Sequence, residues 1–165
     1  MFAYDPTAWS DLGVAAAGAS AALAGLVFVA VSINLDRILA FPWLPGRVGE
    51  TIVLLTAVLV ESLLLVAPGQ SRVAVGAEIL AVGAAAWAIL TAVHARLARQ
   101  GTVMTPLQLR MRILAGQLAS LPALVAGASL LLETGGGLYW LLAGVVLSML
   151  AVISSAWVLL IEIAR

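Results

Sequence analysis

The sequence predicts an all-α integral membrane protein, a bundle of five transmembrane helices. The chain is 64% hydrophobic and 10% charged, whereas soluble domains carry roughly 25% charged residues. Five apolar stretches, each about long enough to cross a bilayer, alternate with short polar connections. All eight basic residues are Arg, and seven of them fall on the same side of a membrane if the five stretches are spans.

The helices are expected at about residues 6–39, 48–66, 72–98, 106–132 and 138–163, within a single transmembrane domain at 1–165. The first begins at Asp5 and Pro6, an N-cap followed by proline at the first helical position. It ends before the proline-rich segment 41–46, which should break a helix. The second ends at a tight turn, in which Pro68 and Gly69 stand as a type II turn requires.

The third helix opens after this turn at Arg72. The fourth begins at a capping box, with Thr105 as the N-cap and Gln108 three positions later. The fifth follows a glycine-rich loop and opens with Tyr139 and Trp140, residues typical of a membrane interface. These signals place every connection at a short polar segment.

The arginine distribution predicts an orientation. The seven arginines on one side are Arg37, Arg47, Arg96, Arg99, Arg110, Arg112 and Arg165. Only Arg72 falls on the other side. By the positive-inside rule the N-terminus is outside and the C-terminus is cytoplasmic. No basic residue precedes the first apolar stretch, so this helix is expected to be retained rather than cleaved. The Arg-only, Ala-rich and Gly-rich composition favours a bacterial cytoplasmic (inner) membrane.

Composition argues against several functions. The net charge is zero with no basic stripe, which argues against nucleic acid binding. There is no Cys and a single His, so thiolate catalysis, haem ligation by two histidines and a zinc site are not expected. We therefore expect no enzyme, no catalytic residue, no cofactor and no metal. The expected partners are the lipid bilayer, further copies of the chain in a homo-oligomer, and other membrane proteins.

Small residues recur every four positions in the first helix, at Gly13, Ala17, Ala21 and Gly25. Such a ridge lets another helix approach closely in lipid. We expect it to pack against a neighbouring helix, as we do for the alanine stripe of the third helix, which includes Glu78. The alternative is that one ridge lines a pore or a subunit interface.

Ionisable residues inside a span are costly and are functional candidates by default. Glu61 and Glu78 lie roughly 8–9 Å inside the outer boundary, on helices joined by a tight turn. If their faces match, they form a candidate proton or cation site, with Arg72 as the counter-ion candidate. A structural role, as a hydrogen bond or an ion pair between helices, stays open.

A second group of candidates lies toward the cytoplasm. Glu50 precedes Glu61 by eleven residues, close to three helical turns, so the two share a face. Asn34 closes the first helix, and His94 is the only histidine. This group suits the inner end of a conduction path, or hydrogen bonds at a membrane interface.

The leading hypothesis is a homo-oligomeric channel or ion/proton pathway that uses these intramembrane carboxylates. The alternative is a non-conducting accessory or regulatory subunit of a larger membrane complex.

Residues 24–35, AGLVFVAVSINL, and the Pro68-Gly69-Gln70 turn followed by Gly76 and Glu78 carry a resemblance. They resemble small bacterial integral membrane proteins, some of which are labelled modulators of the membrane protease FtsH. The resemblance covers roughly the first half of the chain. It implies no catalytic residues, and it implies a membrane-protease modulator as one form of the accessory hypothesis.

Overall fold

The computed structural model describes residues 2–41, 43–99 and 105–157, and this part of the chain is helical with no strand. Two 3₁₀ helices, η1 (Phe2–Tyr4) and η2 (Pro6–Trp9), precede the α-helices. The α-helices are α1 (Ser10–Ile33), α2 (Leu35–Ala40), α3 (Leu44–Val66), α4 (Arg72–Arg99), α5 (Pro106–Leu132) and α6 (Leu138–Trp157). Among these residues, five helices are long and apolar enough to cross a membrane, which is the architecture of a multi-pass membrane protein.

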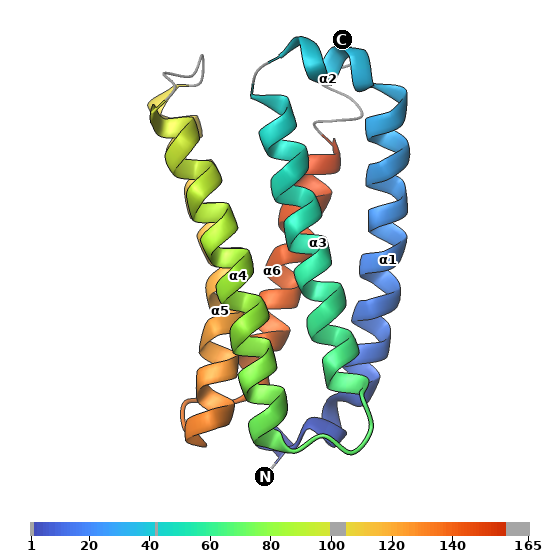
Figure 1. The fold of residues 1–165 in the computed structure, drawn as a ribbon, viewed down its shortest axis with the longest axis vertical. Helices are drawn as coiled ribbons and strands as arrows, with labels where there is room; N and C mark the ends of the chain where they lie inside the picture. The colour runs from blue at the N-terminus through green and yellow to red at the C-terminus, as the bar shows by residue number, and fades with distance from the viewer. Residues whose placement is uncertain (1, 42, 100–104, 158–165) are drawn as a thin grey trace.

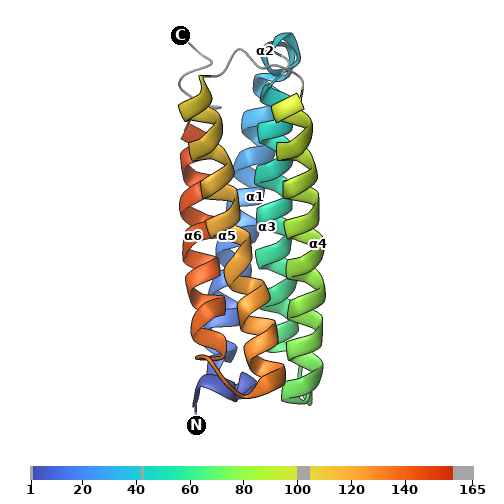
Figure 2. The same cartoon turned by 90° about the vertical axis from the view of Figure 1, so that its left-hand side faces the viewer.

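The five long helices run side by side along the long axis (Figures 1 and 2). One end of the bundle carries α2 and is called the α2 end below. The opposite end carries η1 and η2 and is called the N-terminal end. In Figure 1, α4 and α5 lie close to the other helices at the N-terminal end, and α4 diverges from α3 toward the α2 end.

The local signals at several helix ends are confirmed. The carboxylate of Asp5 caps η2 by accepting from the backbone N–H of Thr7. Thr105 and Gln108 form the expected capping box of α5. Gly69 has φ +74°, as the third residue of a type II turn requires.

Two helix boundaries differ from the prediction. The first helix is interrupted at Asn34, where the backbone leaves α-helical geometry (φ −108°, ψ 17°), and α2 continues after it. The helix α3 begins at Leu44, earlier than residue 48, because Pro45 lies in its first turn and starts the helix instead of breaking it. The expected end of the fifth helix at 163 lies outside the described residues.

The four-residue ridge of the first helix is not a packing surface along its whole length. Gly13 is buried, and a Cβ there would lie 3.0 Å from the carbonyl oxygen of Ser62 on α3. Ala17 is half-buried, whereas Ala21 and Gly25 are exposed, with nothing near Gly25. The face that packs is instead made of Gly13, Ala16, Ser20, Val27 and Ala30.

The alanine stripe of α4 also faces outward. Ala81, Ala85, Ala88 and Ala92 are exposed, so the expectation that this stripe packs on a neighbouring helix of the same chain is wrong. The packed face carries glycines instead. A Cβ on Gly127 of α5 would lie 2.7 Å from the backbone nitrogen of Leu80, so α4 and α5 meet backbone to backbone.

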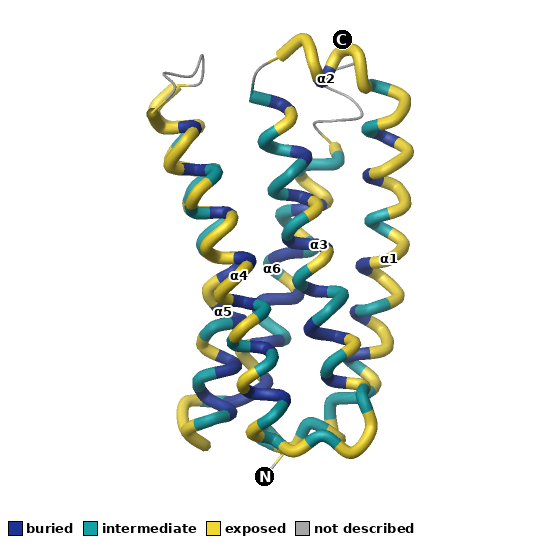
Figure 3. Tube along the Cα trace, in the orientation of Figure 1, coloured by how far each residue is buried: buried dark blue, intermediate teal, exposed yellow. Residues whose placement is uncertain are grey.

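Each long helix carries buried positions on one side and exposed positions on the other (Figure 3). At the N-terminal end a core cluster joins four helices through Leu65, Val75, Ile79, Ala126, Leu130, Leu138 and Leu141. The exposed sides are apolar too, with Phe28 67% and Leu118 57% exposed. Such surfaces suit a lipid environment, in which association depends on close packing rather than on hiding apolar area.

Candidate functional site

Glu61 of α3 is buried in the middle of the bundle. Its side of the helix is the packed one, because Leu54, Val58 and Leu65 are buried at helical spacings of seven, three and four residues from it. The residue is 4% exposed, and its Oε1 atom has no hydrogen-bond partner among the described residues. A buried polar group without a partner is costly and calls for an explanation.

A void of about 10 Å³ adjoins Glu61, which is roughly the space that one water molecule needs. It exists because small side chains surround it, namely Gly83, Ala86, Ala119, Ser120, Gly144 and Ser148. Both serine hydroxyls donate to carbonyl oxygens, Ser148 to Ala119 at 3.2 Å and Ser120 to Gly116 at 2.9 Å. Their oxygen atoms can still accept hydrogen bonds.

Glu78 has a different environment. It is half-buried on α4 and accepts a hydrogen bond from Nε2 of Gln70 at 3.0 Å. The α4 residues at the void are Gly83 and Ala86, which lie on the packed face of the helix. No hydrogen bond or ion pair between described residues joins Glu61 to Glu78, and only Glu61 lines the void, so the structure does not bring the two acids into one site.

Arg72 pairs with Glu133 rather than with Glu61 or Glu78. Its Nη2 atom lies 2.7 Å from Oε1 of Glu133, and its Nη1 atom donates to the carbonyl oxygen of Leu130. Glu133 ends α5 in the left-handed conformation (φ 53°), beside the start of α4. This differs from the counter-ion role expected from the sequence, because the sequence alone does not show that the end of α5 meets the start of α4.

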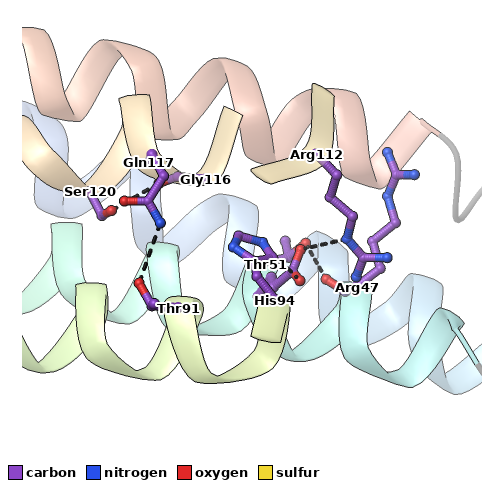
Figure 4. Close-up of polar contacts among 9 residues, drawn as sticks. Arg47, Thr51, Thr91, His94, Arg112, Gly116, Gln117 and Ser120 are labelled. Atoms are coloured by element: carbon purple, nitrogen blue, oxygen red, sulfur yellow. Dashed lines mark hydrogen bonds and ion pairs between the residues drawn. The ribbon is translucent and has the colours of Figure 1, made fainter. Parts of the chain in front are cut away.

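Three helices meet in a charged cluster toward the α2 end, formed by Glu50 of α3, His94 of α4 and Arg112 of α5. Nε of Arg112 lies 3.0 Å from Oε2 of Glu50, and Nε2 of His94 lies 3.3 Å from Oε1 of the same carboxylate. All three side chains are nearly buried: Arg112 is 10% exposed, His94 4% and Glu50 12%. Figure 4 shows His94 and Arg112 converging from their two helices.

The structure thus brings together Glu50 and His94 and adds Arg112, which the sequence analysis used only as a topology marker. Asn34 lies elsewhere, between α1 and α2, where its Nδ2 donates to the carbonyl oxygen of Ala30 at 3.0 Å. A hydrogen-bond chain lies one turn deeper, in which Trp87 donates to Gln117 at 2.7 Å and Gln117 donates to Thr91 at 3.3 Å.

A cavity of about 910 Å³ lies beside this cluster, between α3, α5 and α6. Its polar lining at the α2 end includes Arg47, Glu50, Gln108 and Arg112. Deeper in the bundle its lining is apolar and includes Leu54 and Leu90. Leu54 also lines the void at Glu61, so this side chain borders both the large cavity and the void beside the buried carboxylate.

Within the part of the chain that the structure describes, no group of three or more His, Asp or Glu residues could hold a metal ion. The candidate site consists of Glu61, its void, the charged cluster and the cavity.

Comparison with protein-family models, with curated proteins and with solved structures gives no match. The resemblance to the FtsH modulators stays a prediction.

Proposed function

We propose that this protein is a proton pathway in a membrane, and that protons move between the cavity at the α2 end and Glu61 within a single bundle. The observation that carries the proposal is the position of Glu61. It is buried, its Oε1 has no hydrogen-bond partner among the described residues, and the void beside it shares the lining residue Leu54 with an open cavity. Ionisable groups at such depth mark ion pathways and proton relays.

The first part of the path is the cavity. Its polar end can hold water, and Glu50, which lines it, offers a carboxylate that lies 3.3 Å from Nε2 of His94 behind it. Leu54 and Leu90 are 6% and 0% exposed and close its deep end. Movement of Leu54 would join the cavity to the void and let a water molecule bridge to Glu61.

A proton fits the site at Glu61 better than a metal cation does. Calcium takes 6–8 oxygen ligands, and magnesium usually keeps several waters. The void of about 10 Å³ has room for about one water. A single carboxylate with two serine hydroxyls nearby can bind a proton and donate it onward, whereas it cannot replace a cation's hydration shell.

The arginine distribution gives the proposal a direction. In the proposed orientation the α2 end is cytoplasmic, the N-terminus is outside, and the membrane is a bacterial inner membrane. Toward the N-terminal end the path is closed by the core cluster that includes Leu65, Ile79 and Leu130. Transfer to that side requires these side chains to part.

The test is proton flux into liposomes that contain the purified protein, driven by a potassium-diffusion potential and followed with an enclosed pH-sensitive dye. We expect flux above that of empty liposomes for the native protein, and flux at the empty level for Glu61→Gln, which keeps the shape but not the exchangeable acid. Glu78→Gln is the matched control and should conduct normally. Native flux equal to that of empty liposomes, or undiminished flux in Glu61→Gln, would contradict the proposal.

A second candidate function is that of an accessory subunit that binds another membrane protein. The observation that favours it is the outward-facing alanine stripe of α4 and the exposed Gly18 and Gly25 of α1. Small-residue surfaces of this kind are common at helix contacts in lipid. Purification in mild detergent distinguishes the candidates, because a stoichiometric partner favours the subunit and a homo-oligomer or monomer does not.

A further inference from the structure

We propose that the cavity at the α2 end is a binding site for one anionic lipid, with its head group at Arg47 and Arg112 and an acyl chain along the apolar wall. This inference goes beyond proton transfer and does not depend on it. A lipid bound here would displace the water that the proposed proton path needs, so lipid and water are alternative occupants of the cavity. Three observations carry it: the size of the cavity, its opening toward lipid and the position of its charges.

The size fits a ligand. At about 910 Å³ the cavity lies at the upper end of the range of small-molecule sites. A space of this size with an apolar lining is expected to be filled in a membrane rather than to stay empty. The adjacent void at Glu61 is far smaller and excludes an acyl chain.

The opening points to the bilayer as the source of the ligand. Several apolar residues line the cavity and are also exposed on the outer surface, namely Leu107 (70%), Met111 (60%), Leu118 (57%) and Leu150 (57%). They lie on α5 and α6. The cavity rim is therefore continuous with the lipid-facing surface, and a lipid can enter from the side without leaving the hydrocarbon region.

The charges select the head group. The polar part of the lining carries two arginines, Arg47 and Arg112, and one carboxylate, Glu50. That carboxylate lies against both Arg112 and His94. Among the described residues of the lining, the arginines therefore outnumber the carboxylates by two to one, at the α2 end of the cavity. Phosphate oxygens match guanidinium donors, and basic pockets between transmembrane helices bind anionic head groups.

Native mass spectrometry of the detergent-purified chain tests the site, with phosphatidylglycerol and phosphatidylcholine of identical acyl chains added in turn. We expect one retained phosphatidylglycerol and a preference over phosphatidylcholine of about fivefold or more, the effect of one arginine near the head group. Arg47→Gln should lower this preference at least severalfold. Arg96→Gln, which removes an exposed arginine of α4 outside the cavity, should keep the native preference.

Two blocking variants locate the lipid. Ala151→Phe and Ser154→Trp each place a large side chain into the cavity lining from α6, and both should lose the retained lipid while keeping the native helical circular dichroism. Equal retention of the two lipids by the native chain, or retention in both blocked variants, would overturn the proposal. So would equal losses in Arg47→Gln and Arg96→Gln, or displacement of the lipid by soluble glycerol phosphate alone.

Discussion

A Cβ atom on Gly116 would lie 2.6 Å from Cε1 of His94, so the imidazole of α4 rests directly on the bare backbone of α5. This close approach places His94, 4% exposed, against the carboxylate of Glu50 on a third helix. A glycine on α5 is thus what allows the charged cluster to assemble between three helices.

Gly116→Ala should destabilise the fold by displacing His94. Overpacking costs typically about 1–3 kcal/mol, and the better helix propensity of alanine offsets about 1 kcal/mol of it. Gly49→Ala on α3 is the matched control, since a Cβ there meets nothing within 4 Å. Unfolding by denaturing detergent, followed by circular dichroism, should show Gly116→Ala as the less stable of the two. Equal stabilities would mean that His94 moves aside without cost.

The ion pair between Glu50 and Arg112 should contribute more than the one between Arg72 and Glu133. In the first pair the side chain of Glu50 is 12% exposed and that of Arg112 is 10% exposed. In the second pair the side chain of Arg72 is 26% exposed and that of Glu133 is 63% exposed. Double-mutant cycles with Gln substitutions should give a coupling of about 0.5–3 kcal/mol for the first pair. For the second we expect about 0.2–1 kcal/mol, as for solvent-exposed pairs. A coupling near zero for Glu50 and Arg112 would show that the cluster does not hold the three helices together.

Gly127 and Gly25 are both helix glycines, but only the first should be sensitive to substitution. A Cβ on Gly127 would lie 2.7 Å from the nitrogen of Leu80 and 2.8 Å from the carbonyl oxygen of Gly76, and neither backbone atom can rotate away. Gly127→Ala should therefore lose about 1–3 kcal/mol of stability. Gly25→Ala should lose none in the detergent-solubilised monomer, because nothing lies within 4 Å. A large loss in the monomeric Gly25→Ala variant would contradict the packing described for α1.

Asp5 should show a pKa below its ordinary value, because the hydroxyl and the backbone N–H of Thr7 donate to its carboxylate. Because the pKa of Asp5 is lower in the folded state, the cap stabilises η2 fully at pH values above the unfolded-state pKa. This stabilisation is lost as the pH falls through the folded-state pKa. The loss therefore belongs to the acid range below about pH 4. Carbon NMR of labelled aspartate can follow this titration. In Thr7→Val the pKa of Asp5 should rise toward its ordinary value, and an unchanged pKa would contradict this cause.

The sequence was sufficient to predict the five long helices and several of their ends. Asp5, Thr105, Gln108 and Gly69 act through neighbouring backbone groups, so their local patterns are enough to place helix ends. The apolar stretches were long enough to identify the five spans. The break at Asn34 was missed because the residues on both sides of it are apolar and the helical pattern simply continues.

The rotation of each helix was harder to predict. In a soluble protein the apolar face marks the core, but here lipid-facing and packed faces are both apolar. Ala85 and Gly83 are both small, yet only Gly83 packs against α5. Glu61 could have been placed inside, because ionisable residues within a span almost always face the interior of the bundle. The pairing of Arg112 with Glu50 joins residues 62 positions apart and leaves no local trace.

The central claim is that protons reach Glu61 through the cavity at the α2 end. The chain has no cysteine, so a single introduced thiol can be labelled without background. Ala151→Cys lies in the cavity lining, and Ala92→Cys lies on the exposed face of α4. After complete labelling with a bulky maleimide, proton flux into liposomes should stop in Ala151→Cys and continue in Ala92→Cys. Undiminished flux in fully labelled Ala151→Cys would contradict the account.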